Sequence, residues 1–170
     1  DYLSQLESAA NLVSSKRGEL EEQGKKLASE LNGKRIVIYA DQTFAGVAER
    51  FRQQINENAK QLCWHHALPE MNHNELVGWA GGDDAIGVFI LRNTSDHKRT
   101  KVRMDLTRNI YKNYTNTVIE VNSTGNSNVE RAYYHILLGD WISIHLAELN
   151  DVDPIEIKVI EYLKSELGKI

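Results

Sequence analysis

The sequence predicts an α/β protein, a Rossmann-like three-layer α/β/α sandwich around a mainly parallel sheet. Two apolar runs, KRIVIYAD at 34–41 and AIGVFILR at 85–92, lack the alternation of a strand with one exposed face. Such runs are typical of strands that helices cover on both faces. Amphipathic helical stretches separate the strands, and this alternation favours parallel pairing through right-handed crossovers.

The first half of the chain predicts helix, strand, helix and a short strand. Residues 2–31 carry apolar side chains mostly three or four positions apart, which predicts a helix that Gly18 and Gly24 could divide in two. After the strand at 34–41, residues 43–60 have the apolar spacing of one helical face, with Thr43 as the candidate N-cap. A short strand is expected at 61–67, and a helical stretch at 74–80 follows a polar loop that contains Pro69.

The second half continues the alternation. The strand at 85–92 is followed by a helix within 95–114, a strand at 116–122 and a long, largely buried helix at 129–150. A last helix is expected at 153–167, with Asp153 as its cap and Pro154 at its first position. The three or four strands therefore belong to one sheet, and in open parallel sheets ligands bind at the carboxyl ends of the strands.

Composition narrows the function classes. The 170 residues suffice for one domain, and 20 Lys and Arg against 24 Asp and Glu give a net charge of −4. This charge provides no general attraction for nucleic acid or an anionic membrane. The single cysteine, Cys63, excludes an internal disulfide framework and favours a reducing compartment, so we expect a cytoplasmic protein. No apolar run approaches the ~20 residues of a membrane span, and the first residues do not resemble a signal peptide.

Most candidate sites have a structural interpretation. His65 and His66 lie on or just after a strand, and with Cys63 and His73 they match no standard zinc spacing, so we expect no metal site. The basic run HKRTKVR at 97–103 could hold a phosphate, but a solvated face is the commoner use of such a run. The aromatic residues of the long helix are expected to pack: Tyr133, Tyr134 and Trp141. The segment AGGDD at 80–84 matches no nucleotide-binding motif, so no cofactor is predicted.

Glu57 and His73 form a different kind of pair. Glu57 lies between two asparagines near the end of its predicted helix, where side-chain amides could hold a carboxylate that faces a cleft. His73 follows in the next loop, where Asn72 and Asn74 could fix its tautomer. Spacing alone leaves a catalytic role open, because a glutamate and a histidine in one region are common.

The same region resembles a known family. NENAK at 56–60 and PEMNHN at 69–74 are similar to the central motifs of the bifunctional phosphoglucose/phosphomannose isomerases. The ending DVDPIEIKVIEYLKSEL at 151–167, with Leu163 and Lys164, also resembles that family. The resemblance covers nearly the whole chain and implies a sugar isomerase (SIS) domain, the second of two in tandem. Residues 1–32 would then be a helical connection from an N-terminal SIS domain, and residues 33–170 the C-terminal SIS domain.

The family also implies an activity and its residues. Glucose 6-phosphate or mannose 6-phosphate would be interconverted with fructose 6-phosphate through an enediolate, without a metal or cofactor. By resemblance, Glu57 is the base that moves a proton between C1 and C2, and His73 helps to open the sugar ring. Lys164 would be a further cation for ring opening or substrate contact. The C-terminal half alone is expected to be inactive.

Partners follow from the same resemblance. The family implies a homodimer in which His73 reaches the neighbouring subunit's active site, and the helix at 129–149 is a candidate for part of the interface, although it could equally be core. The alternative is a non-catalytic SIS module that senses phosphosugars. The roles of His65, His66 and Glu70 stay open.

Overall fold

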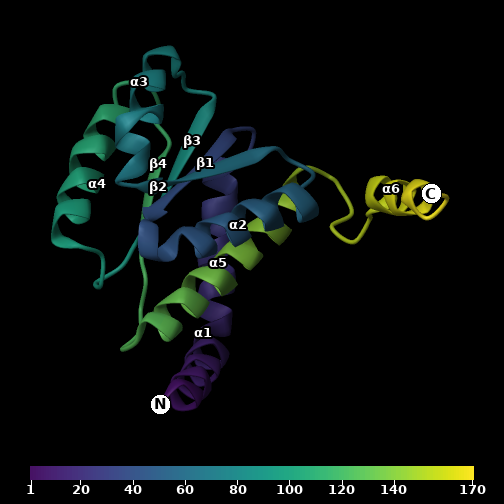
Figure 1. Cartoon of the computed structure of the whole chain (residues 1–170), viewed down its shortest axis with the longest axis horizontal. Helices are drawn as coiled ribbons and strands as arrows, with labels where there is room; N and C mark the ends of the chain where they lie inside the picture. Colours follow the sequence, from purple (N-terminus) through teal and green to yellow (C-terminus); the bar gives the residue numbers. More distant parts are fainter.

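A four-stranded, fully parallel sheet forms the centre of the computed structural model, which describes all 170 residues (Figure 1). Its strands are β1 (Arg35–Asp41), β2 (Cys63–Leu68), β3 (Ile86–Arg92) and β4 (Val118–Asn122), in the order β2-β1-β3-β4. Helices cover both faces of this sheet. The predicted three-layer α/β sandwich is therefore confirmed.

Alternate residues of the central strands enter two separate cores. Ile36 and Ile38 of β1 face α1 (Tyr2–Leu31), α2 (Ala45–Asn58) and α5 (Asn128–Leu149). Val37 and Tyr39 face the other layer, which contains α3 (Glu75–Gly78) and α4 (Lys98–Tyr111). Three short 3₁₀ helices complete the body: η1 (Gln42–Phe44), η2 (Glu70–His73) and η3 (Trp79–Gly81). Both faces of β1 and β3 are buried, which explains their unbroken apolar sequences.

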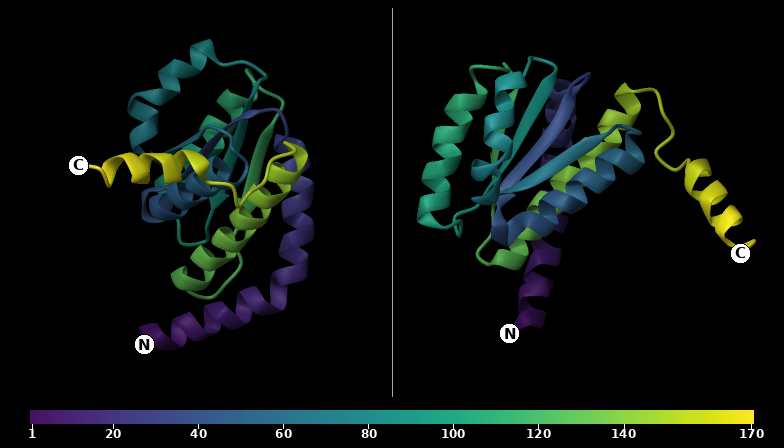
Figure 2. Two further views of the ribbon diagram at one scale, coloured as in Figure 1. Left: turned by 90° about the vertical axis from the view of Figure 1, so that its right-hand side faces the viewer. Right: turned by 45° about the horizontal axis from the view of Figure 1, so that its top comes forward.

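Helix α1 is one continuous helix and is not divided at its glycines, although it bends along its length (Figure 2). Its second half packs in the core through Leu20, Leu27 and Leu31. A Cβ atom at Gly24 would lie 2.6 Å from Cβ of Trp141, so glycine allows α1 to approach α5 closely. The second half of α1 thus belongs to the α/β body, and the role of residues 1–32 as a connection to another domain stays a prediction.

Two helix starts differ from the sequence prediction. Thr43 does not cap α2, because Asp41 accepts hydrogen bonds from its backbone N–H at 2.9 Å and from its hydroxyl at 2.7 Å. These bonds fold residues 42–44 into η1, and α2 begins at Ala45. Asp153 does not cap the last helix either, because its carboxylate accepts from the backbone N–H of Ile155 at 2.9 Å. This local turn delays the start of α6 (Lys158–Leu167).

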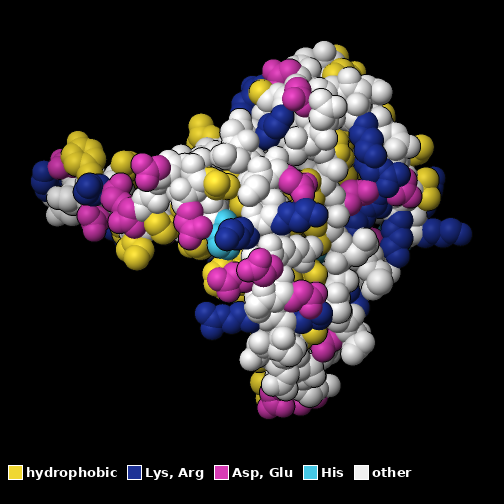
Figure 3. Space-filling model, turned by 180° about the vertical axis from the view of Figure 1, so that it is seen from behind, with side chains coloured by type: hydrophobic (Ala, Val, Ile, Leu, Met, Phe, Trp, Pro, Cys, Tyr) yellow, Lys and Arg dark blue, Asp and Glu magenta, His cyan; other side chains and the backbone are white.

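Residues 153–170, which we call the C-terminal arm, leave the body and project from it (Figures 1 and 2). No residue of α6 is buried. Apolar side chains gather along the arm (Figure 3), and its exposed members are Ile155, Val159, Ile160, Tyr162, Leu163, Leu167 and Ile170. Neither α6 nor any other helix combines the length and apolar character needed to cross a membrane.

Candidate functional site

Glu57 lies in the last turn of α2, at the edge of the sheet where the strands begin, which we call the amino edge. Its position follows from the topology, because α2 runs back from the end of β1 to the start of β2. The side chain is exposed, and its carboxylate has no hydrogen-bond or ion-pair partner. A carboxylate in this state is free to accept a proton from a ligand.

A pocket of about 280 Å³ opens beside Glu57. One wall comes from the end of α2 and the residues before β2, and the other from the C-terminal arm. The lining residues are Asn56, Glu57, Lys60, Gln61, Leu62, Glu156, Ile157, Lys158, Val159 and Ile160. The pocket therefore combines a free carboxylate with ammonium groups and an apolar surface.

The asparagines beside Glu57 do not hold its carboxylate, contrary to the sequence prediction. Asn56 donates from Nδ2 to the carbonyl of Gln61 at 2.7 Å. Asn58 donates from Nδ2 to the hydroxyl of Ser143 at 2.8 Å, which joins α2 to α5. Both amides fix the end of α2, and Glu57 projects between them without their help.

His73 ends η2, beyond the carboxyl end of β2. Its imidazole is exposed and has no hydrogen bond. Asn72 donates to the sulfur of Met71 at 3.0 Å, and Asn74 donates to Glu70 at 3.0 Å. The neighbouring amides therefore leave the tautomer of His73 unfixed, so this part of the sequence prediction is wrong.

Glu57 and His73 of one chain lie at opposite ends of the same strand. β2 contains six residues between them. At a rise of about 3.3 Å per residue, the strand between them is roughly 20 Å long. One chain thus does not bring Glu57 and His73 together.

Lys164 lies in α6 on the C-terminal arm, one turn beyond the last pocket residue, Ile160. It is exposed, and its ammonium group makes no ion pair. Lys164 and Glu57 are therefore on the same side of the molecule, while His73 is on the other.

A cluster around Glu75 holds the loop that carries His73, and the sequence analysis missed it. The Glu75 carboxylate accepts from Trp64 Nε1 at 3.2 Å and lies 2.9 Å from His66 Nδ1. It also accepts from the hydroxyl of Tyr39, which in turn accepts from Trp79 Nε1 at 3.0 Å. These partners come from β1, β2 and η3, so only parallel strand pairing brings them together. His66 contacts Glu75 and Glu70 accepts from Asn74, whereas His65 makes no hydrogen bond. Burial, followed by the charge of Arg52, lowers the pKa of His65.

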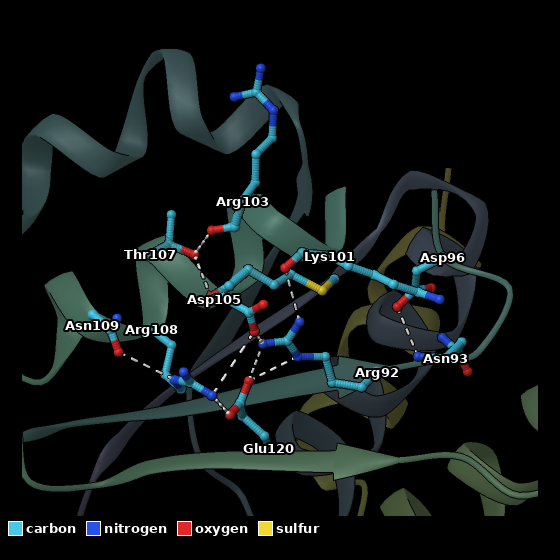
Figure 4. Close-up of polar contacts among 11 residues, drawn as sticks. Arg92, Asn93, Asp96, Lys101, Arg103, Asp105, Thr107, Arg108, Asn109 and Glu120 are labelled. Carbon is cyan, nitrogen blue, oxygen red and sulfur yellow. Dashed lines mark hydrogen bonds and ion pairs between the residues drawn. The ribbon is translucent and has the colours of Figure 1, made fainter. Parts of the chain in front are cut away.

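Two arginines beside α4, Arg92 and Arg108, are neutralised by carboxylates (Figure 4). Glu120 accepts from Arg92 Nε and from Arg108, each at 2.8 Å, and Arg92 also donates to Asp105 at 2.7 Å. Burial would raise the pKa of Glu120, but the bonds from Arg108 and Arg92 outweigh it and lower that pKa. Lys101 donates to the carbonyl of Thr94 at 2.7 Å. Two arginines and two carboxylates leave no free positive charge for a phosphate in this cluster.

Polar side chains fill the opposite, carboxyl edge of the sheet, where we expected a ligand. Asn93 follows β3, its side-chain oxygen Oδ1 accepts from the hydroxyl of Ser123 at 2.6 Å, and its backbone N–H donates to Asp96 at 2.8 Å. His135 lies 3.2 Å from the carbonyl of Arg92 through Nε2, and burial lowers its pKa to about 4. All four side chains are buried. This edge is therefore occupied by its own buried polar groups, and Asn93 Nδ2, Asp96 Oδ1 and His135 Nδ1 have no hydrogen-bond partner there.

No group of three or more His, Cys, Asp and Glu side chains is arranged to hold a metal ion. Cys63, the single cysteine, is buried, and burial raises the pKa of its thiol to about 12. The thiol is therefore protonated at neutral pH and is not poised to act as a nucleophile.

Comparison with known proteins identifies the family of this chain. Residues 20–167 match the model of the bacterial phospho-glucose isomerase C-terminal SIS domain. The bifunctional phosphoglucose/phosphomannose isomerase of Aquifex aeolicus is 36% identical over 167 residues, covering 97% of this chain and 52% of that protein. The enzyme of the same name from Caldicellulosiruptor bescii is 38% identical over 150 residues, covering 86% and 44%. The chain thus spans about half the length of these relatives.

Among solved structures, a glucose-6-phosphate isomerase like protein from Thermus thermophilus superposes with a TM-score of 0.68. It is 21% identical, over 84% of this chain and 46% of that one, so it supports the fold alone. The resemblance first seen in residues 56–60 and 69–74 is confirmed by the family match. This chain belongs to the family of bacterial phosphoglucose isomerase C-terminal SIS domains.

Proposed function

We propose that this chain is the C-terminal half of an aldose-ketose isomerase that interconverts glucose 6-phosphate and mannose 6-phosphate with fructose 6-phosphate. Both relatives described above carry the name bifunctional phosphoglucose/phosphomannose isomerase. The observation that carries the proposal is the unpaired Glu57 carboxylate, which lines a pocket and lies within the family motif NENAK.

Glu57 acts as the base. An aldose to ketose conversion removes a weakly acidic proton beside a carbonyl and returns it to the neighbouring carbon. One carboxylate can serve both carbons of an enediolate if nothing else neutralises or occupies it, and Glu57 meets this condition. Lys164, on the arm that forms the other wall, supplies a positive charge for the ring or the developing oxyanion. His73 supplies the acid and base for ring opening.

The active site takes its residues from two chains. Because the length of β2, roughly 20 Å, lies between Glu57 and His73 of one chain, the two act on one sugar when His73 comes from a second copy. This supports a homodimer in which the loop 69–74 of one subunit meets the Glu57 pocket of its partner. The core-facing side of helix α5 packs on α1 and α2, so only its outward side is available to such an interface.

A further domain is proposed because the chain spans only about half the length of its relatives. An N-terminal SIS domain of the same polypeptide completes the substrate site and binds the sugar phosphate, and without it the C-terminal half does not turn over substrate. The cytoplasm, where sugar phosphates are metabolised, fits a protein whose one cysteine is a free thiol.

The test is an assay of the full-length protein with fructose 6-phosphate that follows both glucose and mannose 6-phosphate. Glu57→Gln keeps the shape of the side chain and removes the base. We expect it to lower kcat by about 10² to 10⁴-fold, the usual contribution of a general base, while sugar-phosphate binding remains. Glu49→Gln, also exposed on α2, is the control and leaves kcat unchanged.

A phosphosugar sensor is the competing outcome of this assay. A sensor would bind fructose 6-phosphate and convert it to neither product, and Glu57→Gln would change nothing measurable. That result would remove the isomerase proposal and leave the SIS fold with a binding role.

A further inference from the structure

One side chain connects the C-terminal arm to the body by hydrogen bonds. Lys60, just after α2, donates from Nζ to the carbonyls of Pro154 at 3.4 Å and Glu156 at 2.6 Å. No other hydrogen bond or ion pair joins residues 153–170 to the rest of the chain. The arm buries no residue of α6, so packing adds little to hold it.

The same ammonium group also holds the end of the helix that carries Glu57. Lys60 Nζ donates to the carbonyl of Glu57 at 2.6 Å. That carbonyl lies at the end of α2, where backbone acceptors lack partners within the helix. The three carbonyls accept from the three N–H donors of the ammonium group. Lys60 therefore links the two walls of the pocket through a single side chain.

The backbone of Lys60 has an unfavourable conformation for a residue with a side chain. Lys60 has φ of +53°, a left-handed conformation that glycine adopts at little cost and lysine does not. Only one other residue besides glycine, Asp151, has a positive φ, also +53°, and its side chain makes no hydrogen bond. Glycine would suit the backbone at position 60, yet it could not reach the arm.

We propose that Lys60 is a positioning residue that fastens the C-terminal arm, and with it Lys164, against the Glu57 pocket. Lys60 touches backbone carbonyls of both walls and orders the second wall of the pocket. This inference rests on the proposed isomerase function for its kinetic consequence. Its structural part, the fastening of the arm, stands independently of that function.

The test compares two glycine substitutions in the full-length protein. Lys60→Gly removes the ammonium group and relieves the backbone, whereas Asp151→Gly relieves the backbone at the matched position only. Spin labels on cysteines placed at Gln53 in α2 and Ser165 in α6, in a background from which Cys63 and any other native cysteine have been removed, report the distance between the helix and the arm. Both label positions lie outside the buried core.

In Lys60→Gly we expect the distance distribution to broaden to a spread of about 15 Å, that of a flexible linker of about seven residues. Asp151→Gly should keep the narrow distribution of the parent protein. Neither variant should unfold at a lower temperature, because glycine fits φ of +53°. In kinetics, Lys60→Gly should raise KM for fructose 6-phosphate about tenfold, the equivalent of losing hydrogen bonds to one charged group.

Two results would overturn the inference. A distance distribution in Lys60→Gly as narrow as in the parent protein means that other contacts fasten the arm. A broadened distribution with unchanged kinetics means that the arm does not shape the site. If the parent protein turns over no sugar phosphate, the isomerase proposal fails, and the distance measurement still decides whether Lys60 fastens the arm.

Discussion

The two edges of the sheet use their polar side chains in opposite ways. At the carboxyl edge, Asp41, Asn93 and His135 are buried and bonded to neighbouring backbone or side-chain groups. At the amino edge, Glu57 is exposed beside a pocket and has no partner. Parallel sheets usually bind ligands at the carboxyl edge. In this chain buried polar side chains fill that edge, with single unpartnered atoms on Asn93 and His135, whereas Glu57 and His73 are exposed at the other edge and on the loop beyond β2.

The difference indicates that the hydrogen bonding of individual side chains is a better guide to a candidate site than the fold alone. A carboxylate that accepts several hydrogen bonds, such as Glu120 or Glu75, is committed to structure. The Glu57 carboxylate has no hydrogen-bond or ion-pair partner within its own chain. Changes at the carboxyl edge should therefore alter stability, and changes at the amino edge should alter activity alone.

The largest expected effect on stability is the pH dependence that His135 causes. Burial lowers the pKa of His135 to about 4. An unfolded histidine titrates near a pH of about 6.5, so between these values the unfolded chain binds a proton that the folded chain does not. Stability is thus complete above about pH 6.5 and falls as the pH drops toward 4, by up to about 3 kcal/mol from this residue.

Denaturant unfolding at about pH 7 and about pH 4 measures this loss. His135→Gln keeps an amide that can bond the Arg92 carbonyl and cannot be protonated, so the variant should lose about 3 kcal/mol less than the parent across this range. Equal losses in both proteins would assign the acid sensitivity to other groups.

A smaller effect is expected at Asp41. Burial would raise its pKa, but hydrogen bonds from the backbone and hydroxyl of Thr43 outweigh burial and lower that pKa. Asp41→Ala removes the cap of η1, which should cost about 1–2 kcal/mol of unfolding free energy at neutral pH. Thr43→Ala removes one of the two bonds and should cost less. A neutral Asp41→Ala would mean that the carboxyl edge does not depend on its polar contacts.

The smallest effect is expected at the amino edge. Removing residues 153–170 takes away no buried side chain of α6 and only the bonds from Lys60. The unfolding free energy should change by no more than about 0.5 kcal/mol, as for other exposed groups. A loss of several kcal/mol on truncation would show that the arm belongs to the core.

Periodicity predicted the body of the molecule well, since β1 and β3 are buried on both faces and the amphipathic helices cover them. Local competition between side chains and backbone displaced the helix starts: Asp41 and Asp153 each bond a nearby N–H group and close a turn. Hydrogen bonding of this kind depends on the actual backbone path, so residue type alone does not decide it.

Sequence motifs identified the candidate residues Glu57, His73 and Lys164, but only the structure showed how these residues are arranged. Spacing along the chain did not reveal that β2 separates the first two by its full length. The Glu75 cluster and the role of Lys60 in holding the arm join residues that are 36 and 94 or more positions apart. Such contacts arise from strand pairing and chain reversal, which local sequence does not encode.

The central claim is that Glu57 of one chain and His73 of another act in one site. Full-length Glu57→Gln and His73→Ala proteins, each inactive alone, can be mixed under conditions of subunit exchange. A mixed dimer then contains one site with both native residues, so the mixture should regain about a quarter of the parent activity if subunits pair at random. Exchange can be followed with differently tagged subunits. If the mixed dimers form and no activity returns, Glu57 and His73 do not share a site between chains, and the account is wrong.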